Sequence, residues 1–82
     1  MYCVKLKLVI NMKKEYYQII RELREDNDLT QSQLAKVLGT SQTMYARYER
    51  KANALPIHHL IKLSQFYHVT TDYILGLNNK IL

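Results

Sequence analysis

The chain has 82 residues, 48% of them hydrophobic, so it can bury one core but is too short for a second. Its single cysteine excludes an internal disulfide, and no run of about 18 apolar residues suggests a membrane span. Lysines interrupt the start of the chain where a secretory signal needs an apolar stretch, so the sequence predicts a cytoplasmic protein.

The net charge of +5 is distributed unevenly along the chain. Residues 1–14 carry four lysines and no acid, and residues 15–28 carry five acidic and two basic side chains. Residues 29–82 carry six basic and two acidic side chains. A basic excess outside the first helix is what a polyanion-binding face requires, but basic charge alone is equally typical of an ordinary solvated surface.

The amino-terminal segment has the pattern of a β-strand, since every second residue from Tyr2 to Ile10 is large and apolar. A lone strand has no partner in a helical domain. Three interpretations therefore stay open. The segment pairs with its copy in a dimer, covers a groove of the helical body, or is a leader that precedes a start at Met12.

A helix is predicted over residues 15–27, because apolar side chains recur there at helical spacing. A second helix is predicted over residues 31–38. Thr30 is a suitable N-cap for it, and Gln33 completes a capping box. Gly39 follows at the position where a helix end needs a positive φ, which glycine adopts without penalty.

The second half of the chain predicts three further helices. Ser41 caps one over residues 42–50, and Pro56 suits the first turn of the next. Thr70 is an N-cap candidate for a short last helix, which Gly76 closes. The tyrosines at helical spacing predict core packing rather than stacking on nucleic acid bases. They are Tyr16, Tyr45, Tyr48, Tyr67 and Tyr73, of which Tyr73 could instead support dimer contacts.

Two short helices joined by a tight turn form the helix-turn-helix arrangement, in which the helices cross at about 90–120°. Ala35 is small enough to allow their close approach, and Gly39 makes the turn. The chain here resembles the Cro/lambda-repressor-type, or xenobiotic-response-element, helix-turn-helix proteins. The matching stretches are IRELRE (20–25), LTQSQLAKVLGTSQTMYARYE (29–49), Pro56 and LIKLSQFYHVTTDYILG (60–76).

This resemblance implies an all-α, five-helix, lambda-repressor-like DNA-binding domain over residues 15–76. Residues 1–14 lie outside the family core and would form an extension, which their alternating pattern makes a candidate strand or dimerisation arm, and residues 77–82 would form a tail. It further implies that the third predicted helix lies in the DNA major groove, with its polar first residues against base edges.

The resemblance also assigns roles to single residues. Bases would be contacted by Gln42, which can bond adenine, by Thr43, and by Arg47, which can bond guanine. Phosphates would be contacted by Gln31, Ser41, Arg50, Lys51, Asn53 and His58. Arg24 and Glu49 would form a salt bridge, because an acid at the end of a DNA-binding helix repels phosphate unless a cation neutralises it.

Other kinds of site are disfavoured by the sequence. His58 and His59 are adjacent, point about 100° apart on a helix and have no nearby acid or cysteine, so no metal is predicted. No cofactor motif and no catalytic motif is present, and an enzyme is not expected. Gln42, Thr43 and Arg47 would be an ordinary solvated helix face if the surrounding spacing were absent.

The sequence thus predicts a sequence-specific transcriptional regulator that binds double-stranded DNA as a homodimer on a palindromic operator. No membrane partner is expected. The alternative is an antitoxin-like or other protein-interaction module with the same fold, in which residues 2–10 add a strand to the sheet of a partner protein.

Overall fold

The computed structural model describes residues 14–77, in which every regular element is an α-helix. The helices are α2 (Tyr16–Asp26), α3 (Gln31–Leu38), α4 (Gln42–Glu49), α5 (Ile57–Tyr67) and α6 (Thr71–Ile74). The predicted all-α, five-helix fold is therefore confirmed, and most helix bounds agree with the prediction within one residue. The strand predicted over residues 2–10 lies outside the described residues.

Local sequence signals explain where the helices begin and end. Thr30 Oγ1 accepts a hydrogen bond from the Gln33 backbone N–H at 3.1 Å, and the Gln33 side chain accepts one from the Thr30 N–H at 2.7 Å. Gly39 ends α3 with φ 73°, as predicted for the turn. Ser41 caps α4 through the Met44 N–H. Pro56 lies just before α5 rather than within its first turn.

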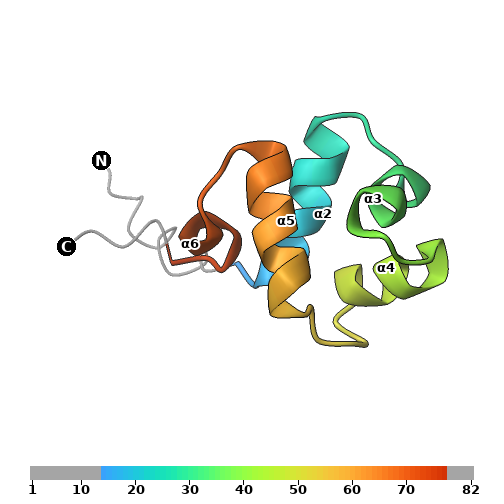
Figure 1. The fold of residues 1–82 in the computed structure, drawn as a ribbon. Coiled ribbons are helices and arrows are strands. Elements are labelled where there is room, and N and C mark those ends of the chain that lie inside the picture. The colour runs from blue at the N-terminus through green and yellow to red at the C-terminus, as the bar shows by residue number, and fades with distance from the viewer. Residues whose placement is uncertain (1–13, 78–82) are drawn as a thin grey trace.

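The helices pack so that α3 and α4 lie at one end of the molecule and α6 at the other, with α2 and α5 between them (Figure 1). α3 packs mainly on α4, and α2 contacts both α4 and α6. The core that joins them consists of Ile20, Leu34, Ala35, Leu38, Tyr45, Tyr48, Leu63 and Ile74. None of the helices within residues 14–77 is both long enough and apolar enough to cross a membrane.

The tyrosines divide into two groups. Tyr45 and Tyr48 are buried, and Tyr16 and Tyr67 pack against the core, as expected from their spacing. Tyr73 is 42% exposed, so its assignment to the core is wrong. The reason is that α6 has only four residues, and Ile74 is the one that it buries.

Two glycines with positive φ offer a matched test of the backbone. A Cβ on Gly76 (φ 80°) would lie 2.6 Å from the Lys14 carbonyl oxygen, whereas one on Gly39 (φ 73°) would meet nothing within 4 Å. In both alanine variants the new residue must adopt the left-handed conformation, which costs about 1 kcal/mol of stability. Gly76→Ala adds a backbone clash, so we expect it to cost about 2–4 kcal/mol in urea unfolding. Equal losses of stability in the two variants would contradict the close approach of Gly76 to the Lys14 carbonyl oxygen.

Candidate nucleic-acid interface

Helix α4 has one buried face and one exposed face. Tyr45 and Tyr48 lie in the core and fix the helix against the domain. Gln42, Thr43 and Arg47 are all exposed on the other side. The three side chains predicted to contact bases thus project from one short helix that is anchored along its opposite face.

Arg24 and Glu49 form an ion pair that ties α2 to the end of α4. Arg24 Nε donates to Glu49 Oε2 at 2.8 Å, and Arg24 Nη2 donates to Glu49 Oε1 at 3.1 Å. The Arg24 guanidinium also donates to the Leu29 carbonyl at 2.9 Å, which fixes the loop before α3. The Glu49 side chain is only 3% exposed and that of Arg24 14%, so the pair is largely shielded from solvent.

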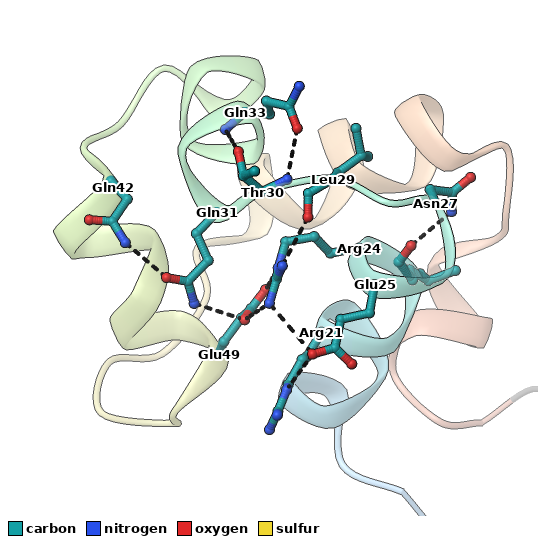
Figure 2. A network of polar contacts seen from close by, with 11 residues as sticks. Arg21, Arg24, Glu25, Asn27, Leu29, Thr30, Gln31, Gln33, Gln42 and Glu49 are labelled. Carbon is teal, nitrogen blue, oxygen red and sulfur yellow. Dashed lines mark hydrogen bonds and ion pairs between the residues drawn. The ribbon is translucent and has the colours of Figure 1, made fainter.

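This ion pair continues as a chain of hydrogen bonds to the first residue of α4 (Figure 2). Gln31 Nε2 donates to Glu49 Oε1 at 3.0 Å, and Gln31 Oε1 accepts from Gln42 Nε2 at 2.8 Å. Gln31 is the first residue of α3, and Gln42 is the first residue of α4. The starts of the two helices are therefore joined through their side chains.

The surroundings of Glu49 keep its carboxylate charged. Burial alone would raise its pKa, but the hydrogen bonds and positive charge of Arg24, together with the neighbouring Tyr45 and Gln31 side chains, outweigh this effect, and the net pKa lies below the ordinary value. Burial raises the pKa of the neighbouring Tyr45 phenol, and the Glu49 carboxylate raises it further. The negative charge of Glu49 is thus a fixed part of the structure at neutral pH.

The remaining residues predicted to contact phosphate lie around α4. Ser41, Arg50, Lys51 and His58 are exposed, and Asn53 is half-buried. Ser41 already uses its hydroxyl oxygen to cap α4. Arg47 Nη1 donates to Asn53 Oδ1 at 3.4 Å. The predicted set thus borders α4, and part of it is engaged in contacts within the protein.

Some contacts of this surface were not predicted. The links from Gln31 to Glu49 and to Gln42 join residues 18 and 11 positions apart. The Lys51 ammonium lies 5.5 Å from the centre of the Tyr17 ring, a cation–π contact with α2. The only available sequence signal was the glutamine at the start of each helix, and pairing the two requires knowledge of how the helices cross.

The adjacent histidines have different environments. His58 is exposed, whereas His59 is 7% exposed, and its ring lies 5.7 Å from that of Tyr48. Burial lowers the pKa of His59, and the neighbouring His58 and Lys62 lower it further. In residues 14–77, no three His, Cys, Asp or Glu residues are grouped as metal ligands.

The family of this chain follows from its match to a known family model. A family model described as helix-turn-helix matches residues 20–74, which include α3, the turn at Gly39 and α4. This chain belongs to the helix-turn-helix family. The resemblance to Cro/lambda-repressor-type proteins is confirmed by this match and by the relatives.

Two relatives come from Bacillus subtilis. An "uncharacterized HTH-type transcriptional regulator YobD" is 39% identical over 64 residues, which cover 78% of this chain and 57% of that protein. The "HTH-type transcriptional regulator ImmR" is 35% identical over 57 residues, which cover 70% of this chain and 45% of that protein. The helix-turn-helix chain thus spans about half the length of these relatives.

Two solved structures share the fold. The P22 c2 repressor, crystallised in complex with the synthetic operator 9T, matches with a TM-score of 0.71 and 25% identity over 78% of this chain and 97% of that one. A transcriptional regulator from Listeria innocua matches with a TM-score of 0.75 and 20% identity over 83% of this chain and 64% of that one. The second likeness shows the fold alone.

Proposed function

We propose that this helix-turn-helix protein is a sequence-specific transcriptional regulator that binds double-stranded DNA. The observation that carries the proposal is the exposed face of α4, where Gln42, Thr43 and Arg47 project together while Tyr45 and Tyr48 anchor the helix. A helix of this kind fits the major groove with its first residues at base edges. The operator complex of the similar P22 c2 repressor supports the same use of the fold.

Affinity and specificity come from different residues in this proposal. Contacts with phosphates set the position of the domain on the duplex. They are made by Gln31 at the start of α3 and by Ser41, Arg50, Lys51, Asn53 and His58. Gln42, Thr43 and Arg47 distinguish base pairs. We assign this activity to residues 15–76, with 1–14 as an extension and 77–82 as a tail. When the protein occupies a promoter, it then either represses or activates transcription.

The base-contacting role is tested by Arg47→Ala. Because one bidentate contact with guanine is worth about 1–3 kcal/mol, we expect the variant to lose affinity and discrimination at one operator position. The measurement is the affinity for a set of duplexes that differ by single base pairs. Lys51→Ala is the comparison, since losing a phosphate contact weakens binding to all duplexes alike. A uniform loss in Arg47→Ala would contradict base contact.

We further propose that the protein binds as a homodimer to a roughly palindromic operator, with half-site centres about 34 Å apart. The support is a set of three large apolar side chains, on α6 and in the residues after it, that are exposed in this structure: Tyr73, Leu75 and Leu77. The segment that carries them lies at the end of the molecule away from α3 and α4 (Figure 1). We place the interface at this end, so that both copies of α4 stay free for DNA.

Sedimentation distinguishes this interface from one made by the amino-terminal segment. We expect Leu77→Lys, which puts a charge at the interface, to give a monomer, and deletion of residues 1–11 to leave the dimer intact. Leu77 is 48% exposed, so the substitution does not disturb the core. A monomer produced by the deletion alone would place the interface on residues 2–10. A monomeric unaltered protein would contradict the homodimer.

A further inference from the structure

Two hydrogen bonds link Glu49 through Gln31 to Gln42, and the chemistry of a carboxylate fixes which group donates in each of them. A carboxylate only accepts hydrogen bonds, so Gln31 must turn its amide nitrogen towards Glu49, where Nε2 lies 3.0 Å from Oε1. The Gln31 oxygen then faces Gln42 and accepts from Gln42 Nε2 at 2.8 Å. With Gln31 reversed, its oxygen would face the carboxylate and the hydrogen bond to Glu49 would be lost.

This direction determines what Gln42 has left to offer a ligand. A glutamine amide has two hydrogens on Nε2 and one acceptor, Oε1. One hydrogen of Gln42 is used by Gln31, so one hydrogen and the oxygen remain free on this exposed side chain. In the major groove adenine presents one acceptor and one donor, whereas guanine presents two acceptors. The free groups of Gln42 therefore match adenine and lack the second donor for guanine.

We propose that Glu49 is a specificity-determining residue, which orients the Gln31 amide and through it makes Gln42 favour adenine over guanine. This inference rests on the proposed function, since it needs Gln42 to meet a base. Glu49 touches no DNA in this account and acts as a positioning residue. Its buried ion pair with Arg24 keeps it an acceptor, because both its oxygens receive hydrogen bonds from the guanidinium.

Glu49→Gln is the variant that tests the proposal. The new amide can either accept from Gln31 or donate to it, so Gln31 can turn its nitrogen towards Gln42 and free both hydrogens of Gln42 for guanine. The base pair contacted by Gln42 is first identified as the one at which Gln42→Ala loses its preference. There we expect Glu49→Gln to lower the adenine-to-guanine affinity ratio by about 2- to 10-fold, the equivalent of one hydrogen bond.

A control removes the same charge elsewhere. Glu22, on α2, pairs with Lys14, which precedes that helix. Glu22 takes no part in the hydrogen bonds that link Arg24 to Gln42, so Glu22→Gln should leave the ratio unchanged. An unchanged ratio in Glu49→Gln would overturn the proposal. An equal loss of discrimination at the Arg47 position would also overturn it, because that result indicates a loosened α4 rather than a reoriented amide.

A second variant keeps the proposal testable if Glu49→Gln folds poorly, and side-chain NMR adds a readout that needs no DNA. Gln31→Met removes the link but leaves the Arg24–Glu49 pair, and we expect the same fall in the ratio. In the free protein, the side-chain amide resonances of Gln31 and Gln42 should shift together in Glu49→Gln; a shift of Gln31 alone would overturn the orientation. These resonances do not depend on DNA, so they decide the orientation even if the unaltered protein shows no base preference and the proposed function fails.

Discussion

Arg24→Met is expected to destabilise the protein by about 3–5 kcal/mol, because it leaves the Glu49 carboxylate buried without its counter-ion. The variant also loses the hydrogen bond to the Leu29 carbonyl in the loop before α3. A small domain has only about 5–15 kcal/mol of stability, so a large share of the total is at stake. Urea unfolding followed by circular dichroism measures the loss of stability. The m-value should stay unchanged if the variant exposes the same surface on unfolding as the unaltered protein.

A double variant separates an unpaired charge from lost packing. Replacing both partners by methionine removes the buried charge together with its counter-ion, so we expect Arg24→Met/Glu49→Met to recover most of the stability that Arg24→Met loses. A loss below about 1 kcal/mol in the single variant would instead be typical of an exposed pair, and would contradict the shielding of Glu49.

The same pair gives a pH dependence with a definite sign. The pKa of Glu49 is lowered in the folded protein. The ionised carboxylate therefore contributes to folding stability at neutral pH, and this contribution is lost as the pH falls through that lowered pKa. In Arg24→Met, burial without the arginine raises the pKa of Glu49, and protonation then favours the folded state. The stability difference between the two proteins should therefore shrink on acidification from neutral pH to below ~4.

Salt is expected to have the largest effect on DNA binding. If a dimer makes about six phosphate contacts, raising the salt from about 50 to 200 mM should weaken binding to any duplex by about a thousandfold, because released counter-ions no longer favour the complex. Fluorescence anisotropy with a random-sequence duplex measures this slope.

Variants assign the salt slope to residues. Lys51→Ala should reduce it by about one unit per protomer, whereas Thr43→Val, which changes a base-contacting residue without changing charge, should leave it unaltered. No binding at low salt would contradict the DNA-binding proposal and favour a protein-interaction module. A steep slope that Lys51→Ala does not change would exclude Lys51 from the phosphate contacts.

Local signals explain why so much of the fold could be predicted from the sequence. The capping box of Thr30 and Gln33, the Ser41 cap and the positive φ of Gly39 involve residues a few positions apart, and each favours one conformation regardless of what surrounds it. The turn between α3 and α4 follows from these signals, and with it the exposed face of α4.

Longer-range features could not be predicted in the same way. The link between Gln31 and Gln42 depends on how α3 and α4 cross, which periodicity does not specify. The exposure of Tyr73 depends on the shortness of α6, where spacing alone placed this ring in the core. The family resemblance supplied the partner of Arg24, since nothing local connects it with Glu49, 25 positions later.

The most direct test of base recognition by α4 is selection of bound duplexes from a random pool with the unaltered protein and with Arg47→Ala. We predict an enriched palindromic sequence with half-sites about one helical turn apart, in which Arg47→Ala relaxes a single position of each half-site. A pool that remains random after selection, or the same enriched sequence from both proteins, would contradict the account.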